Sequence, residues 1–145
     1  TRETTRRKDT TSISGAMLFA QEMLNLRRAT ARKLVLDISG DGPNNHGIAV
    51  EEARDRLVAD GIIINGLPIM VNANDVFAGF DLSELDTYYQ DRVIGGHGAF
   101  LVSALSWREF PDAVIRKLVL EISGGTPETD QPVPWLNVNY RKGNP

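Results

Sequence analysis

The sequence predicts an α/β fold, with an open, mainly parallel β-sheet that carries helices on both of its faces. Segments whose apolar residues recur at three- and four-residue spacing, the pattern of amphipathic helices, alternate along the chain with short apolar runs bounded by glycine. This alternation is typical of right-handed β-α-β crossovers within one sheet. With 145 residues, of which 41% are hydrophobic, the chain is long enough for one core of this kind.

The first half of the chain predicts two helices and two strands. Apolar spacing that starts at Ile13 indicates a helix to about residue 29. The run KLVLDIS at 33–39, closed by glycine, predicts a strand that is covered on both faces. Residues 48–59 form a second amphipathic helix with acidic residues in its first turns, and a second strand begins at Ile62.

The second half of the chain continues the alternation. The sequence DLSE at 81–84 has the form of a capping box, which predicts a helix to about residue 92. The run AFLVSA at 99–104 predicts a third strand. A second capping box, SWRE at 106–109, predicts a last helix to about residue 122.

Two nearly identical nonapeptides are expected to fold differently. RKLVLDISG at 32–40 is short and leads into a glycine loop, which favours a strand. RKLVLEISG at 116–124 continues an apolar stripe at helical spacing that begins near Val114, which favours a helix. Because tertiary context overrides local propensity, we predict strand for the first and helix for the second, with internal duplication as the rival explanation.

The chain divides into a domain at 1–124 and a tail at 125–145. The tail is rich in Pro, Gly and Asn and has no apolar period, so we expect it to be extended. Trp135 and Leu136 are apolar residues within it. They are candidates for contact with a partner, and docking on the domain itself is an equal alternative.

Composition excludes several classes of function. The net charge of −3, with acids and bases intermixed, argues against nucleic acid as a partner. No apolar run approaches the ~20 residues that cross a bilayer. The chain has no cysteine, which excludes disulfides, thiolate metal ligands and cysteine nucleophiles. It opens on Thr1 and a polar stretch, which indicates a chain processed or cut from something longer.

The loop after the first strand, GDGPNN, is the principal candidate site. Asp41, Asn44 and Asn45 offer the hard oxygen ligands that Mg²⁺, Ca²⁺ or Mn²⁺ prefer, and Thr11 and Ser12 are candidates to complete the site from a second loop. Ordinary turn chemistry is the alternative explanation of the same residues. The two histidines, at 46 and 97, have no identifiable catalytic partner by spacing, so no catalytic residue is assigned.

The segments VLDISGDGPNN, GIIINGLPI, DLSELDTYY and VIGGHGAF resemble a bacterial group of von Willebrand factor type A-like proteins of unknown function. The resemblance covers about residues 11–124 and implies a Rossmann-like sheet. In von Willebrand A domains three loops build a metal-ion-dependent adhesion site. TSISGA is similar to the second loop and SGDGPNN to the third, which implies metal ligands at Thr11 and Asp41, with Ser12, Asn44 and Asn45 around them.

The first loop of that metal site, Asp-x-Ser-x-Ser, does not occur in this chain. The resemblance therefore implies a carboxyl-terminal portion of the fold, incomplete without an amino-terminal portion that includes the strand next to 33–39. An apolar strand left at the edge of a sheet invites pairing with another chain. We accordingly expect a protein partner, a chain or fragment that completes the sheet. Relatives with secretion signals imply an extracytoplasmic setting, periplasmic or secreted.

Three functions compete at this stage. The first is a non-enzymatic interaction or assembly module, in which Thr11 and Asp41 hold a divalent ion that a partner's acidic side chain completes. The second is a purely structural subunit whose metal site is vestigial. The third is a Mg²⁺-dependent phosphatase, because GDGPNN is similar to the GDG-x-N-D motif of haloacid dehalogenase-like enzymes. That chemistry needs an aspartate nucleophile at a neighbouring strand end.

Overall fold

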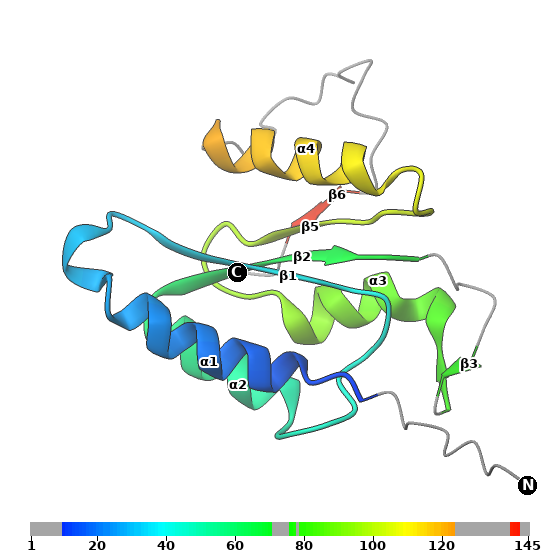
Figure 1. Cartoon of the computed structure of the whole chain (residues 1–145), viewed down its shortest axis with the longest axis horizontal. Helices are drawn as coiled ribbons and strands as arrows, with labels where there is room; N and C mark the ends of the chain where they lie inside the picture. The colour runs from blue at the N-terminus through cyan, green and yellow to red at the C-terminus, as the bar shows by residue number, and fades with distance from the viewer. Residues whose placement is uncertain (1–9, 71–75, 78, 124–139, 143–145) are drawn as a thin grey trace, which may run out of the picture.

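The computed structural model describes residues 10–70, 76–77, 79–123 and 140–142. It confirms an α/β fold with an open, mainly parallel sheet, in the order β1-β2-β5-β6 (Figure 1). The parallel strands are β1 (Leu34–Gly40), β2 (Ile62–Pro68) and β5 (Phe100–Val102). β6 (Tyr140–Lys142) runs antiparallel to β5, and the short strands β3 (Val76–Phe77) and β4 (Phe80–Asp81) pair separately.

Helices cover both faces of the sheet. Three lie on one face and α4 lies on the other (Figure 1). The helices are α1 (Ile13–Asn25), α2 (Val50–Ala59), α3 (Leu85–Tyr88) and α4 (Phe110–Ile122). Shorter helical turns are Arg28–Thr30, Leu82–Glu84 and the π-helical Tyr89–Val93.

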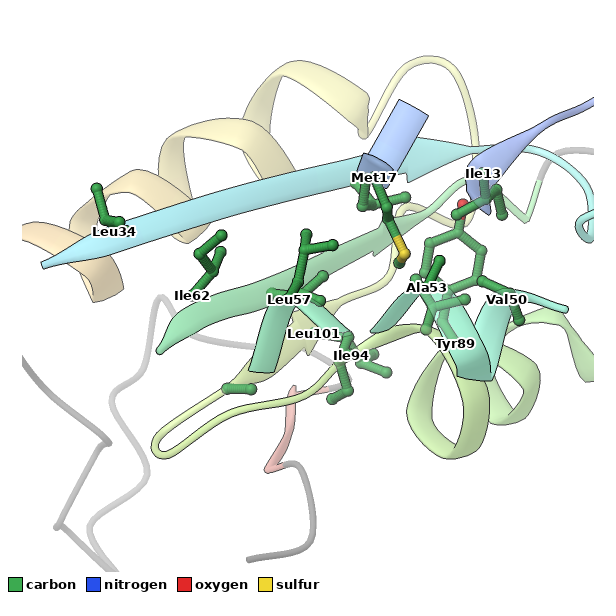
Figure 2. Close-up of a cluster of buried hydrophobic side chains, with 14 of the residues drawn as sticks. Ile13, Met17, Leu34, Val50, Ala53, Leu57, Ile62, Tyr89, Ile94 and Leu101 are labelled. Carbon is green, nitrogen blue, oxygen red and sulfur yellow. The ribbon is translucent and has the colours of Figure 1, made fainter. Parts of the chain in front are cut away.

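The side chains of the strands point alternately into two apolar clusters, one on each face of the sheet. On the α1 and α2 side, Ile62 and Ile64 of β2 belong to the cluster that contains Tyr89 and side chains from both helices. Figure 2 shows Ile62 and Tyr89 toward opposite ends of this cluster. On the α4 side, Leu67 of β2 packs with Phe100 and Val102 of β5 and with Ala113 and Leu120 of α4. Because successive strand residues point to opposite faces, a short strand contributes to both clusters.

Among the residues that the structure describes, Tyr89 is the largest fully buried side chain, and two glycines make room for it. A Cβ atom added at Gly40 would lie 2.9 Å from the Tyr89 hydroxyl, and one at Gly66 would lie 3.0 Å from its ring carbon Cδ1. Burial raises the pKa of Tyr89, so the phenol stays neutral. Its hydroxyl has no hydrogen-bond partner among the described residues.

Several helix ends differ from the sequence-based boundaries. α1 ends at Asn25, short of residue 29, and a 3₁₀ turn follows. The helix predicted from 81 is a composite of 3₁₀, α and π turns, although the side chain of Asp81 does accept a hydrogen bond from the Ser83 N–H at its start. In the second capping box, the Glu109 N–H donates to the Ser106 hydroxyl at 3.2 Å, but α4 itself begins at Phe110. Proline at the next position favours a helix start there.

The two nonapeptides fold as predicted, the first in β1 and the second in α4. Within the tail, residues 140–142 add an antiparallel strand to the sheet. Trp135 and Leu136, the candidate partner residues of the tail, lie outside the described residues. Within the described part of the chain, no helix is both long and apolar enough to cross a membrane.

Candidate functional site

The start of α1 and the loop after β1 are joined by side-chain hydrogen bonds. Ser12 is the N-cap of α1, where its hydroxyl accepts a hydrogen bond from the Gly15 N–H at 3.2 Å. The same hydroxyl donates to the carbonyl of His46 at 3.0 Å. Gly47 has φ of +90°, and a Cβ there would lie 2.8 Å from the buried Ser14 hydroxyl. The loop therefore approaches the helix start more closely than another residue would allow.

The two asparagines of the loop add further hydrogen bonds that hold the loop against the start of α1. The Thr11 N–H donates to Asn45 Oδ1 at 2.7 Å, and the Asn45 N–H donates to the Thr11 carbonyl at 2.9 Å. Asn44 Oδ1 accepts from the Ser14 N–H at 3.0 Å, and the Asn44 amide nitrogen donates to the Ile48 carbonyl at 3.1 Å. Sequence spacing singled out both asparagines as metal-site residues, and here their side-chain amides hold the two segments together.

Thr11 lies beside the loop that follows β1, and Asp41 is the first residue of that loop; their role as metal ligands stays a prediction. Asp41 directly follows β1, is exposed, and makes no hydrogen bond or ion pair with other described residues. Thr11 is half-buried, and only its backbone is engaged with the loop. One carboxylate and one hydroxyl fit a divalent ion only if another segment supplies further ligands. Within the described residues, no three His, Cys, Asp or Glu side chains gather in one place.

The phosphatase hypothesis requires an aspartate nucleophile beside Asp41. The neighbouring strand β2 ends in Leu67 and Pro68, and Ile69 follows, so its carboxyl end carries no carboxylate. His46 and His97 are both exposed. The described neighbours of the loop therefore offer no nucleophile of the kind that phosphoryl transfer would need.

The outer edge of β1 is the second notable feature of the molecule. Among the described residues, β1 pairs only with β2, from Leu34 opposite Ile62 to Gly40 opposite Pro68. Apolar side chains are exposed on both layers that flank the sheet. On α1 these are Phe19 and Met23, 67% and 51% exposed, and Leu26 just beyond the helix. On α4 they are Ile115, Leu118 and Ile122.

The helical positions place the exposed residues of α1 on one side. At 100° per residue, Phe19 and Met23 lie about opposite to Gln21 and Asn25. Gln21 and Asn25 donate hydrogen bonds to Asp60 at the end of α2. The apolar side of α1 thus faces away from α2, where the next element of the layer would pack.

A buried lysine joins α4 to the sheet beside this edge. Lys117, whose side chain is 5% exposed, forms ion pairs with Asp37 of β1 and with Glu121, the latter at 2.8 Å. Glu121 also accepts a hydrogen bond from the Asn65 side chain at 2.7 Å. A groove of about 180 Å³ adjoins the cluster and is lined by Asp37, Ser39, Leu67, Phe110, Val114, Lys117 and Leu118.

The two acids of this cluster respond differently to their surroundings. Burial, together with the nearby Glu121, raises the pKa of Asp37 even though Lys117 opposes the shift. Burial also acts to raise the pKa of Glu121, but hydrogen bonds from Lys117, Asp37 and Asn65 outweigh it and hold that pKa below its ordinary value. Both carboxyl groups therefore depend on the single ammonium group of Lys117.

Sequence reasoning missed this cluster, although a signal was present. Asp37 and Glu121 occupy equivalent positions in the two nonapeptides, and Lys117 is the lysine of the second. The helical interpretation of residues 116–122 places Lys117 and Glu121 four residues apart on one face of a helix. Which face meets the sheet depends on tertiary packing, which the pattern did not reveal.

The fold and the loop define an α/β protein of the open-sheet class, with a polar loop at the carboxyl end of its edge strand. A family model described as "protein of unknown function (DUF1194)" matches residues 1–126, and the chain belongs to this family. A search of curated proteins and a search of solved structures each found no match.

Proposed function

We propose that the protein is an interaction and assembly module that binds another polypeptide along the outer edge of β1. The observation that carries this proposal is the single pairing of β1 within the described chain. An edge strand presents a row of N–H and C=O groups that can template a further strand. Residues 34–36 of β1 read Leu-Val-Leu, and the charged residues of this edge are Lys33 before them and Asp37 after them.

Exposed apolar side chains on α1 and α4 also support a binding surface at the β1 edge. Phe19 and Met23 on one layer and Leu118 on the other expose apolar area beside the strand. Exposed apolar surface of this kind, bordered by polar residues, is typical of protein interaction sites. A partner that only paired with β1 would leave the exposed apolar side chains of α1 and α4 uncovered. The partner therefore contributes side chains to both helical layers.

The loop at Thr11 and Asp41 adds a second contact in this proposal. Together with a carboxylate supplied by the partner, Thr11 and Asp41 would hold a divalent ion such as Mg²⁺, Ca²⁺ or Mn²⁺. Supporting this, the Asn45 bonds fix the Thr11 backbone beside the loop, and Asp41 is exposed. The resemblance to von Willebrand A domains supports the same role, and it also supports an extracytoplasmic setting. A purely structural module, without metal, is the alternative.

Adding negative charge to the exposed apolar side of α1 tests whether this surface binds a partner. The double substitution Phe19→Glu and Met23→Glu adds two carboxylates at exposed positions, so folding should be retained. We expect the unmodified chain to associate as its concentration rises, and the double variant to associate at least tenfold more weakly, because a buried carboxylate opposes contact. Sedimentation velocity measures both.

The matched control is Ala59→Glu, which adds a carboxylate at an exposed position of α2. It should associate like the unmodified chain. A monodisperse monomer that unfolds cooperatively at every concentration would overturn the proposal. Association that the double variant leaves unchanged would show that the contact lies elsewhere.

Manganese tests the loop. We expect Mn²⁺ to broaden the amide NMR signals of Thr11 and Asp41 selectively. The dissociation constant should be on the order of 1 mM, because one carboxylate supplies few of the ligands of a complete site. Asp41→Ala should abolish the broadening, while Asp55→Ala, an exposed acid on α2, should leave it unchanged. Broadening that is equal at Asp41 and Asp55, or absent, would favour the purely structural module.

A further inference from the structure

We propose that a cavity beside α3 binds a small aliphatic diamine, a molecule with an apolar chain and a positively charged amino group at each end. The cavity has a volume of about 340 Å³ and is lined by Phe80, Glu84, Thr87, Tyr88, Asp91 and Arg92. This volume is within the range of small-molecule sites in proteins, about 300–1,000 Å³. The inference goes beyond the proposed function, because it uses neither the β1 edge nor the loop at Asp41.

Two helices lie between this cavity and the edge of β1. α2 connects β1 with β2, whereas the cavity residues lie in the connection from β2 to β5. α1 packs against β1 and α2, and α2 in turn packs against the π-helical turn Tyr89–Val93. The resemblance places an amino-terminal portion beside residues 33–39, on the other side of α1 and α2. The cavity therefore lies away from the surface that such a portion would cover.

Two aromatic rings form the apolar part of the cavity. The ring of Phe80 in β4 packs edge to face with that of Tyr88 in α3, with ring centres 5.4 Å apart and an angle of 75° between the rings. Tyr88 is also held at its hydroxyl, which accepts a hydrogen bond from the Asn44 N–H at 3.1 Å. The rings therefore give the cavity a fixed apolar surface against which an aliphatic chain can pack.

Two carboxylates of the lining have no counter-charge. Glu84 and Asp91 are exposed, and neither side chain forms an ion pair or accepts a hydrogen bond within the described part of the chain. The positively charged lining residue, Arg92, is already paired. Its Nη1 atom lies 2.9 Å from Glu51 Oε1, and its guanidinium lies 5.9 Å from the centre of the Tyr88 ring. The cavity therefore keeps two negative charges that attract cations.

The positions of the two acids indicate a ligand with two cationic groups. Glu84 and Asp91 are seven residues apart in a helical segment, so a rise of about 1.5 Å per residue separates them by about 10 Å along its axis. Tyr88 lies between them, four residues after the first and three before the second, which places all three on one side of the segment. The order of acid, aromatic ring and acid matches a molecule that has an amine at each end and an apolar chain between.

Putrescine is the probe for this site, and butylamine, which has the same carbon chain with a single amino group, is its matched control. We expect putrescine to shift the amide NMR signals of Thr87, Asp91 and Asn44 until the site is saturated. Asn44 responds because its N–H is bonded to the Tyr88 hydroxyl. Butylamine should bind about fivefold more weakly, since it leaves one carboxylate without a partner and an exposed ion pair contributes no more than that.

Substitution of either acid tests the two-point contact. Glu84→Gln and Asp91→Asn each remove one carboxylate at an exposed position, so folding should be retained. In each variant the advantage of putrescine over butylamine should disappear. Asp112→Asn, which removes an exposed acid from α4 on the other face of the sheet, should keep the full advantage. Asp41→Ala should also keep it, which separates this cavity from the proposed ion site.

The outcomes decide the proposal. Saturable binding with this pattern supports a diamine site. No saturable binding, equal affinity for the two amines, or an advantage that neither substitution of an acid changes would overturn it. An arginine-containing peptide that competes with putrescine and binds more tightly would assign the cavity to a partner's side chain, and would overturn the small-molecule ligand. None of these results depends on the association or manganese experiments, which use other surfaces.

Discussion

Replacing Tyr89 with alanine is expected to lower the free energy of unfolding by about 4 kcal/mol. The side chain is fully buried in the α1 and α2 cluster, close to the sheet at Gly40 and Gly66. The surrounding backbone belongs to two strands and a helix that cannot collapse into the space. Urea denaturation of the purified chain measures the loss, which the change in midpoint should report.

Tyr89→Phe should instead raise the free energy of unfolding. It keeps the ring and removes a hydroxyl that has no hydrogen-bond partner among the described residues. An unsatisfied buried hydroxyl costs about 1–3 kcal/mol, so we expect the phenylalanine variant to gain about 1 kcal/mol. A loss of stability would show that the hydroxyl is satisfied, for example by a bound water, and would contradict this account of Tyr89.

Replacing Lys117 with methionine should cost about 3 kcal/mol near neutral pH. Methionine fills a similar volume, so the loss of stability measures the effect of removing the positive charge. Asp37 and Glu121 would remain beside each other without the ammonium group. The low end of the usual range applies because Asp37 is half-exposed. The double variant Lys117→Met with Glu121→Gln should recover part of the loss, because it removes the repulsion.

The effect should shrink as the pH falls. The lowered pKa of Glu121 stabilises the native protein above the unfolded-state pKa of this group, and that contribution disappears as pH falls through the folded-state value. In the variant, both acids are without their cation and are more stable when protonated. Denaturation at about pH 3 and about pH 7 should therefore give a smaller difference at the lower pH. An equal difference at both would show that packing, and not charge, explains the effect.

Much of the fold could be predicted from the sequence, because its elements are bounded by local signals. The β1 strand ends at glycine, α2 has acids in its first turn, and the apolar spacing from Ile13 identifies α1. The nonapeptide pair was assigned correctly because its flanking sequence, and not the shared residues, carries the information. The loop that contains Asp41 was selected as a candidate site because ligands of open sheets bind at strand ends, and its function stays a prediction.

The remaining features depend on contacts between residues distant in sequence. Gly40 and Gly66 look like ordinary strand glycines until Tyr89 is seen against them. The cluster of Lys117 with Asp37 and Glu121 joins segments 80 residues apart, and periodicity does not state which helix face meets which strand. Likewise, the pairing of 140–142 with β5 gives a polar, aperiodic segment a place in the sheet that its composition does not suggest.

The two nonapeptides have a consequence for how the chain folds. Since nearly the same residues form β1 and the last half of α4, neither conformation is chosen by local preference alone. The helical copy needs the sheet surface at Phe100 and Val102 to dock against before its conformation is decided. We therefore expect α4 to acquire its structure late, after the strands have assembled, and to be the first helix to lose it when the sheet is disturbed.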